Sequence, residues 1–435
     1  MRSTRGEGCV PRRREEPDVV MPQREDPARW GAPHESVCCA CGSADVRLFY
    51  EGRGVPAQSC ILVDDAHLAR DYPTGSIRLG LCDSCGLIQN TAFDPALIDY
   101  SKPAEESQAF SPTFSAYACE LAQSLVARYG LRGKTVLEIG SGKGDFLRLL
   151  AEEGIMAGIG IDPGYLPDRQ GGDAGPRLHF LTEYFTNDHV GLPADLICCR
   201  HVLEHIRPVA AFVRLVKRAA DATRCPVVFF EVPDVRRVLA EGAFWDVYYE
   251  HCSYFSAGSL ARLFRALGFR VTRLALAYDR QYVLLEARSV ADENGRVQHI
   301  EAAAVGDPVT EETVEELERE VRFFTTSVDA KVSYWRDVLG EARRQGRRIV
   351  LWGGGSKAVG FLSAVEARDE VDCVVDINPF KQGLYLPGSG HRVLAPEALV
   401  DRRPDMVVVM NPIYLGEIEV WLVQHGVSSE VVGLA

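Results

Sequence analysis

The sequence predicts an α/β protein in which a small cysteine-bearing module precedes two units of alternating strands and helices. Three observations support this fold class: a pair of Cys-x-x-Cys-Gly turns near the N-terminus, and a strand followed by a glycine-rich turn at both Val136–Gly144 and Val350–Gly355. Strands that alternate with helices favour parallel sheets covered by helices on both faces. A chain of 435 residues also exceeds one ordinary hydrophobic core, so several domains are expected.

The composition limits the classes of function and the compartment. The first 34 residues are rich in Arg, Glu and Pro, which predicts a disordered tail without the apolar stretch of a secretory signal. Thirteen cysteines then favour a reducing compartment, and we expect a cytoplasmic protein. A net charge of −13 argues against nonspecific binding to nucleic acid. The chain carries no apolar run of membrane-spanning length, and we expect a monomer or homodimer that binds small molecules.

The N-terminal module carries two metal-ligand motifs. Cys38 and Cys41 form the first Cys-x-x-Cys pair, and Cys82 and Cys85 form the second. Each pair presents two thiolates from one tight turn, and two such turns together make a tetrahedral four-sulfur site that suits structural zinc. Cys39 could take the place of Cys38, although the spacing favours Cys38. The alternative is four unligated thiols. A closed four-sulfur site has no open position, so we assign it no catalysis.

The central unit alternates strands with helical segments, which predicts a doubly wound sheet with a cofactor at the carboxyl ends of its strands. A helical pattern at Ser259–Leu267 ends at Gly268. Five strands are expected: Thr135–Ile139, Ala157–Ile161, Leu196–Cys199, Pro226–Glu231 and Tyr282–Ala287.

A glycine-rich turn follows the first of these strands. Glu138 stands near the strand end, and Gly140, Gly142 and Gly144 follow at alternate positions. Glycine lets the backbone turn sharply and approach a bound ligand closely. The spacing differs from the G-x-G-x-x-G pattern of dinucleotide-binding turns. It resembles the cofactor loop of S-adenosylmethionine (SAM)-dependent methyltransferases, which implies that these four residues hold SAM.

Further candidates for cofactor binding follow along the chain. Asp162 ends the second strand, where a carboxylate accepts hydrogen bonds from ribose hydroxyls in NAD-binding proteins as well. Glu183 and Tyr184 could bracket an adenine ring. His201 and His205 lie in a segment that resembles the one following the fourth strand in class I methyltransferases. The alternative for these histidines is a pair of polar residues at a helix start, and they lack the order of an H-E-x-x-H metal site.

An aromatic stretch, Phe244–Ser256, surrounds the Glu250-His251 pair. Aromatic side chains such as Tyr248 can hold a sugar ring and keep the site partly dry. Histidine suits the role of general base because its ordinary pKa lies near the pH at which enzymes operate. The alternative is an aromatic loop that only caps the sheet.

The remaining chain predicts a connecting helix and a second α/β unit. The charged run 311–320 is more typical of a solvated connecting helix than of a partner-binding face. We expect the glycine turn after the next strand to be structural, although Lys357 or Lys381 could contact a substrate phosphate. Three strands are expected in this unit: Arg348–Trp352, Cys373–Asp376 and Met406–Met410.

Taken in order, these motifs resemble one family over about residues 35–430. The paired cysteine turns, the glycine loop, Leu203-x-His205, Tyr248-x-Glu250-His251 and the C-terminal glycine turn occur as in the sugar C-methyltransferases of deoxysugar biosynthesis. The resemblance implies a nucleoside-diphosphate 4-keto-deoxysugar as substrate. It also implies that His251 is the base, and that Tyr248, Glu250 and His205 orient the substrate or stabilise an enolate.

The resemblance has one departure. Ala104 occupies the place of a family tyrosine, although Tyr100 is retained, so an O-methyltransferase or a noncatalytic SAM-binding scaffold stays open. The expected division of the chain is a tail (1–34), a zinc-binding domain (35–109), a class I SAM-dependent methyltransferase domain (110–300), a connecting helix (301–345) and a C-terminal Rossmann-like domain (346–435).

Overall fold

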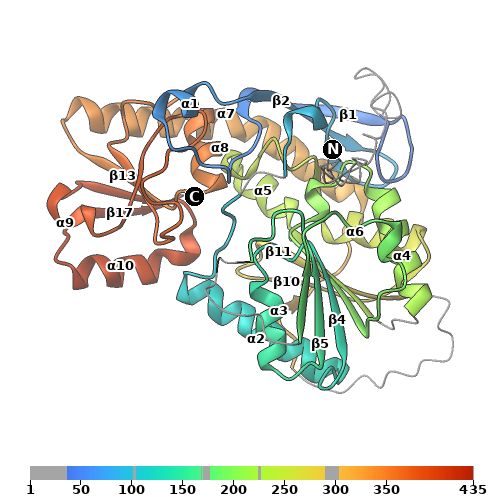
Figure 1. Ribbon diagram of the computed structural model, residues 1–435. Helices are drawn as coiled ribbons and strands as arrows, with labels where there is room; N and C mark the ends of the chain where they lie inside the picture. Colours follow the sequence, from blue (N-terminus) through green and yellow to red (C-terminus); the bar gives the residue numbers. More distant parts are fainter. Residues whose placement is uncertain are drawn as a thin grey trace, which may run out of the picture. The chain divides into compact units, whose positions relative to one another are not determined.

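The described residues form three β-sheets (Figure 1). Some segments named above lie outside the described residues: the predicted tail (1–34), residues 101–103 and Pro226, the first residue of a predicted strand. The structure does not test the expectations for these segments. In the described part of the chain, no helix is long and apolar enough to cross a membrane. The computed structural model describes residues 37–100, 104–167, 169, 177–223, 227–289 and 303–434.

The four-stranded sheet joins the cysteine module to the aromatic stretch. Its strands are antiparallel, in the order β1-β2-β3-β9. The edge strand β9 comes from far along the chain and pairs Tyr254 with Ile88 and Ser253 with Gln89. The sequence did not indicate this pairing, because two residues are too few for a periodic pattern. The strands are β1 (Val46–Pro56), β2 (Thr74–Cys82), β3 (Ile88–Asn90) and β9 (Ser253–Tyr254), with α1 (Ala66–Arg70) between β1 and β2.

The eight-stranded sheet is the doubly wound sheet that the sequence predicts. Its order is β12-β10-β11-β8-β7-β4-β5-β6, in which β4 to β8 are parallel and β11 runs antiparallel to β8. Strands β4 and β5 have the predicted bounds, whereas β7, β8 and β11 extend further. The strands are β4 (Thr135–Ile139), β5 (Ala157–Ile161), β6 (Leu178–Leu181), β7 (Leu196–Arg200), β8 (Val227–Pro233), β10 (Phe269–Ala277), β11 (Tyr282–Ser289) and β12 (Asp307–Pro308).

Helices cover both faces of this sheet because successive strand residues point to opposite sides. Val136 packs with α2 (Pro112–Tyr129) and α3 (Asp145–Glu152) on one face. The next residue, Leu137, packs with α4 (Val209–Thr223) and α6 (Ala257–Ala266) on the other face. Both faces of the sheet are therefore covered by helices, and in such folds a ligand binds at the carboxyl ends of the strands.

The five-stranded sheet is all parallel, in the order β15-β14-β13-β16-β17. Its strands are β13 (Ile349–Trp352), β14 (Cys373–Val375), β15 (Val393–Leu394), β16 (Met406–Val409) and β17 (Glu430–Gly433), and its helices are α8 (Ser356–Val365), α9 (Ala398–Arg402) and α10 (Leu415–Gln424).

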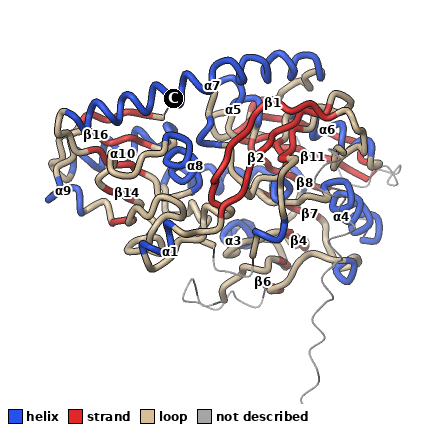
Figure 2. The backbone as a smooth tube through the Cα atoms, turned by 90° about the horizontal axis from the view of Figure 1, so that it is seen from above, coloured by secondary structure: helices blue, strands red, loops and turns tan. Residues whose placement is uncertain are grey.

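The connecting helix α7 (Val314–Arg344) is less solvated than expected. Thr313 caps its N-terminus in a reciprocal pair with Glu316. One side of the helix is buried through Phe324 and Trp335, which pack in a core shared with β13, α8 and α5 (Val235–Glu241). Figure 2 shows α7 extending along one edge of that view, past α5 and β1. The expectation of a solvated connector is therefore wrong for this buried side.

Candidate active site and metal site

A cavity of about 640 Å³ lies at the carboxyl ends of the central strands and is shared with the cysteine module and the C-terminal glycine turn. All four predicted catalytic residues line it. The predicted cofactor-binding residues Gly144 and Glu183 are not part of its wall. The residues predicted from sequence that line the cavity are Glu138, Gly140, Gly142, Asp162, Tyr184, His201, His205, Tyr248, Glu250 and His251.

The glycine loop lines the cavity next to a buried carboxylate oxygen that lacks a partner among the described residues. Gly140 has a φ of 72°, and a Cβ there would lie 2.0 Å from Val202 Cγ2. The Gly142 amide donates a hydrogen bond to Asp162 Oδ2 (2.8 Å). Glu138 Oε2 is buried without a hydrogen-bond partner among the described residues. Burial raises the pKa of Glu138 to about 8. An ammonium group, such as that of the methionine moiety of SAM, fits beside this orphaned oxygen.

Gly144 and Glu183 are engaged in local packing and hydrogen bonding outside the cavity. A Cβ on Gly144 would lie 2.6 Å from Phe180 Cζ, so this glycine makes room for a packed ring. Glu183 accepts a hydrogen bond from His189 Nε2 (3.0 Å). Tyr184 reaches the cavity but is 57% exposed, which places it at the rim. The geometry therefore supports Tyr184 and Asp162 near a cofactor better than Glu183.

His201 belongs to a buried charge network. Its Nε2 donates to Glu231 Oε1 (2.9 Å), and Arg200 Nε donates to Glu231 Oε2 (2.8 Å). Burial opposes charge on the imidazole, but Glu231 prevails and raises the pKa of His201 to about 9. His201 therefore carries a positive charge at neutral pH and holds the turn after β7.

This network makes stability depend on pH. A raised folded-state pKa stabilises the fold fully below the ordinary value of 6.5, and this contribution is lost as the pH rises through about 9. We expect the free energy of unfolding to fall by about 1–3 kcal/mol over that range. Urea unfolding at several pH values measures it, and a His201→Gln variant should lose that component. An equal pH dependence in the variant would contradict the assignment.

The predicted base lies in a cluster of rings. The His251 and His205 ring centroids are 4.7 Å apart, and those of His251 and Tyr248 are 4.8 Å apart. His205 Nδ1 donates to the Glu250 carbonyl oxygen (3.2 Å). Burial and the neighbouring His205 lower the pKa of His251 to about 3. His251 is therefore neutral at physiological pH and offers a nitrogen lone pair to the cavity. The lowered pKa also makes it a weaker base than the histidine with an ordinary pKa that the sequence led us to expect, because general-base catalysis is most efficient with a pKa near the operating pH.

Two of the predicted partners of His251 are directed elsewhere. Glu250 Oε1 accepts hydrogen bonds from the backbone N–H (3.1 Å) and the hydroxyl of Ser59 in the cysteine module. Tyr248 donates its O–H to Asp246 Oδ1 (2.6 Å), so its only proton is already used. In this geometry both side chains fix the loop around His251.

Several acidic residues that line the cavity were not predicted from the sequence, among them Asp246 and Glu204. Asp246 pairs with Arg237 from α5 and with Lys357 from the C-terminal glycine turn. Lys357 is therefore already paired. The signal available for Asp246 was an acidic residue within the aromatic stretch, two positions before Tyr248.

The C-terminal glycine turn is held mainly by its own unit. Gly354 N–H donates to Asp376 Oδ2 (2.7 Å), and Lys381 Nζ pairs with the same oxygen (3.2 Å). The Ser356 hydroxyl donates a hydrogen bond to Ser59 Oγ (2.7 Å), since the Ser59 proton is given to Glu250, and this contact ties the turn to the cysteine module. These contacts agree with a structural turn that also forms one wall of the cavity.

The tyrosine retained near the domain junction also reaches the cavity. Tyr100 and Ala104 both line it. The Tyr100 hydroxyl is buried, and no partner for it occurs in the described part of the chain. Burial raises the pKa of Tyr100, so its hydroxyl stays protonated and available as a donor.

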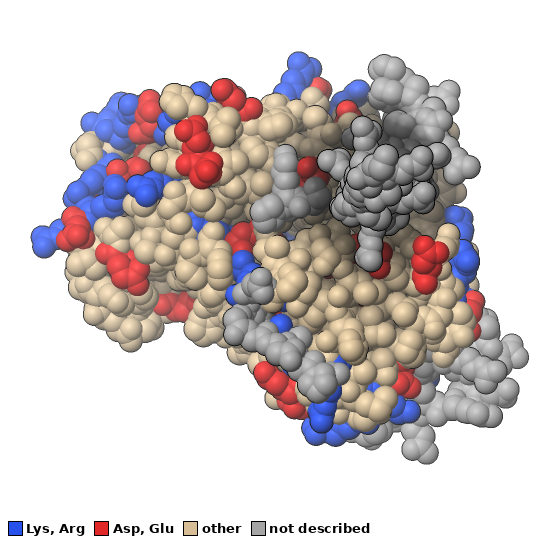
Figure 3. Space-filling view, viewed as in Figure 1, with Lys and Arg blue, Asp and Glu red and all other residues tan. Residues whose placement is uncertain are grey.

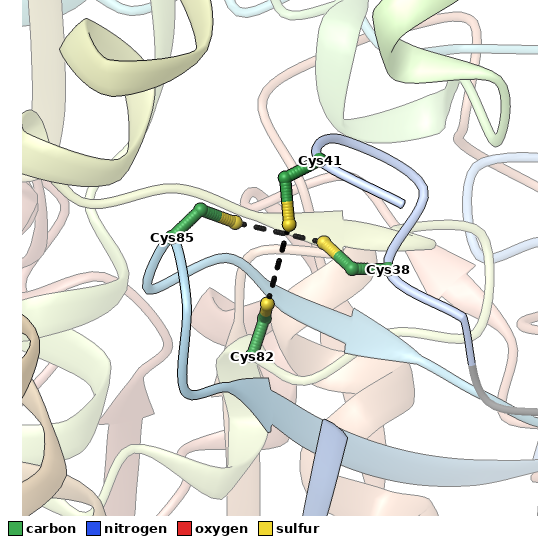
Figure 4. Close-up of side chains that lie close together, drawn as sticks. All are labelled: Cys38, Cys41, Cys82 and Cys85. Carbon is green, nitrogen blue, oxygen red and sulfur yellow. Dashed lines mark hydrogen bonds between the residues drawn. The ribbon is translucent and has the colours of Figure 1, made fainter. Parts of the chain in front are cut away.

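The four cysteines converge on one point (Figure 4). Cys38 Sγ and Cys85 Sγ are 3.5 Å apart, Cys41 Sγ and Cys82 Sγ are 3.6 Å apart, and all four sulfurs lie within 4.8 Å of one another. Tetrahedral zinc with Zn–S bonds of about 2.3 Å needs sulfurs roughly 3.8 Å apart, so the donor set fits zinc. Cys39 Sγ instead contacts Ser253 Oγ (3.7 Å).

The charged side chains are mixed on the surface. Figure 3 shows basic and acidic groups interspersed on the visible face, without a broad area of one sign among the described residues drawn there. Many form short-range pairs, such as Arg265 with Glu311 (2.5 Å). Such pairs are worth little to stability individually.

Comparison with known proteins agrees with the class of protein that the fold indicates. The model of a methyltransferase domain matches residues 114–274, and the model of a C-methyltransferase C-terminal domain matches residues 287–422. The C-methyltransferase NovU of Streptomyces niveus is 29% identical over 317 residues, which cover 69% of this chain and 71% of NovU.

Two solved structures resemble part of the chain. Magnesium protoporphyrin IX methyltransferase from Synechocystis PCC 6803 is 17% identical, with a TM-score of 0.32 over 41% of this chain and 84% of that one. A putative SAM-dependent methyltransferase from Listeria monocytogenes is 17% identical, with a TM-score of 0.32 over 40% and 99%. At these scores, the two likenesses add nothing about the site.

The sheet order, the glycine loop and the matching domain model define a SAM-dependent methyltransferase. Its C-terminal region matches the model of a C-methyltransferase C-terminal domain, and the chain is similar to the C-methyltransferase NovU, as the sequence motifs indicated.

Proposed function

We propose that this enzyme transfers the methyl group of SAM to a carbon next to the ketone of a nucleotide-linked keto-deoxysugar. The observation that carries the proposal is His251, a neutral histidine in the wall of the cavity that also contains the glycine loop. A carbon acceptor needs a base, because a C–H bond must lose its proton before the carbon attacks a methyl group.

Some residues of the cavity would bind the cofactor, and others would act on the acceptor. SAM, when bound, supplies an electrophilic methyl group on a sulfonium. Glu138 and Asp162 would hold its polar ends, and Gly140 and Gly142 belong to the same cavity wall. The buried Glu138 oxygen without a partner among the described residues supports this assignment.

The acceptor side of the cavity is built for proton removal. His251 would take the proton next to the ketone, and Tyr100, which keeps a free hydroxyl proton, would donate a hydrogen bond to the developing enolate oxygen. Tyr248 and Glu250 would act by fixing the loop, since Asp246 and Ser59 already engage them. The structural zinc and its sheet would hold β9 directly behind this loop.

The second candidate is oxygen methylation of a sugar or natural-product hydroxyl, which Ala104 keeps open because it leaves space where the family has a tyrosine. Product NMR after turnover with methyl-¹³C-labelled SAM separates the two. We expect the labelled methyl carbon to couple to a ring carbon. A methyl resonance in the methoxy region, without carbon–carbon coupling, would show oxygen transfer instead. A binding scaffold would give no labelled product from any acceptor.

A further inference from the structure

Glu204 is a buried carboxylate in the cavity wall to which the proposed reaction gives no role. It lies in the 3₁₀ turn Leu203–His205 and is only 2% exposed. Its Oε1 lies 3.7 Å from His201 Nδ1. Its Oε2 is buried and has no hydrogen-bond partner in the described part of the chain. A buried oxygen without a partner is costly, so its presence in the cavity wall points to a function.

This carboxylate faces the predicted base. An oxygen of Glu204 and ring nitrogens of His205 and His251 lie within 4.8 Å of one another. The turn is tied to the loop of the base, because His205 Nδ1 donates to the Glu250 carbonyl oxygen and Cys252 Sγ contacts the Glu204 carbonyl oxygen. The distance between carboxylate and base is therefore set by two anchored segments.

Glu204 stays ionised although it is buried. Burial opposes its charge, but the interaction with the protonated His201, together with the neighbouring His205, holds the pKa of Glu204 below its ordinary value. A negative charge is thus present beside His251 before any proton moves.

The other groups around His251 cannot play the same part. Asp246 is already paired with Lys357 and Arg237. His201 is positive through Glu231, and Tyr248 and Tyr254 are neutral, with pKa values raised by burial. The neighbouring His205 lowers the pKa of His251 and so does not stabilise its protonated form. Glu204 is the acidic group with a spare oxygen among the described residues facing the base.

We propose that Glu204 is the positioning residue of the base, and that its carboxylate stabilises the imidazolium formed when His251 takes the substrate proton. The inference rests on the proposed function. In the step, the C–H bond breaks, its electron pair forms the enolate double bond and the ketone π pair moves to oxygen. The His251 lone pair binds the proton. The enolate carbon then bonds to the methyl group, the S–CH₃ electron pair stays on sulfur, and the His251 proton passes to solvent.

Proton removal can be measured without methyl transfer. The full-length zinc-loaded enzyme, with S-adenosylhomocysteine and thymidine-diphosphate 4-keto-6-deoxyglucose in D₂O, should exchange one of the two hydrogens next to the ketone, on C3 or C5. Proton NMR measures the loss of that signal. We expect Glu204→Gln to slow this exchange and kcat by about 10-fold to 100-fold with KM little changed. Glu204→Asp, which keeps the charge, should recover part of the rate.

Glu312→Gln is the matched control. Glu312 is also a buried carboxylate, 3% exposed, but it caps α6 through the Ser256 hydroxyl (2.6 Å) and lies outside the cavity wall. We expect this variant to lower thermal stability and leave the exchange rate unchanged.

The possible results test the role of Glu204 and the proposed function separately. Exchange at the wild-type rate in a folded Glu204→Gln variant would overturn the role of Glu204 alone. Full exchange in His251→Ala would overturn the proposed base. Turnover that requires an added divalent cation, and loses this requirement in Glu204→Gln, would also overturn the inference, because Glu204 would then be a metal ligand.

Discussion

Replacement of His251 with alanine is expected to lower kcat by about 10²-fold or more, because a positioned general base typically contributes that much. His251 is the cavity-lining histidine whose neutral form is favoured by burial and by His205. SAM affinity, measured by calorimetry, should change little, since the glycine loop belongs to another part of the wall. Single-turnover kinetics separates the chemical step from product release.

The pH profile of the same enzyme sharpens this expectation. A base whose pKa lies at about 3 is unprotonated throughout the neutral range, so kcat/KM should show no acid limb near 6.5. His189→Ala is the matched control, because His189 is buried but lies outside the cavity wall. Full turnover by His251→Ala would remove this residue from the mechanism.

Loss of the zinc site is the second change that we expect to have a large effect, here on folding and activity. Structural zinc contributes on the order of 10 kcal/mol to the folding of small zinc modules. We expect a Cys82→Ser, Cys85→Ser double variant to lose about one zinc per chain, to expose β1 and β2 to hydrogen exchange, and to lose activity. Activity is lost because β3 pairs with β9 beside the base loop and Ser59 holds Glu250.

The eight-stranded sheet should survive this change, so binding of S-adenosylhomocysteine should persist in the double variant. Cys119→Ser is the control, since Cys119 lies in α2 away from the four-sulfur cluster. Retention of zinc, small-sheet protection and activity in the double variant would count against a structural site.

The central fold could be predicted from the sequence where the signal is local. Strands β4 and β5 are apolar runs bounded by glycine and acidic residues, so their bounds follow from the pattern. Strand β10 was missed because Arg270 and Arg273 interrupt its apolar pattern, and its pairing with β11 is what stabilises it. Intrinsic strand preference is weak beside such tertiary pairing.

The residues of the candidate site also differ in whether the sequence alone could predict them. His251 stands out in the sequence because aromatic residues flank a Glu-His pair. The direction of Glu250 could not be predicted, because its partner Ser59 lies 191 residues away. The spare oxygen of Glu204 and the Lys357 pair with Asp246 likewise depend on contacts between distant segments.

A cocrystal structure with S-adenosylhomocysteine and thymidine-diphosphate 4-keto-6-deoxyglucose tests the central claim most directly. The account predicts the cofactor along Gly140 and Asp162, with its sulfur directed at a sugar carbon that also lies within hydrogen-bond reach of His251. A sugar hydroxyl oxygen in that position, or a cofactor bound at Gly353–Gly355, would contradict it.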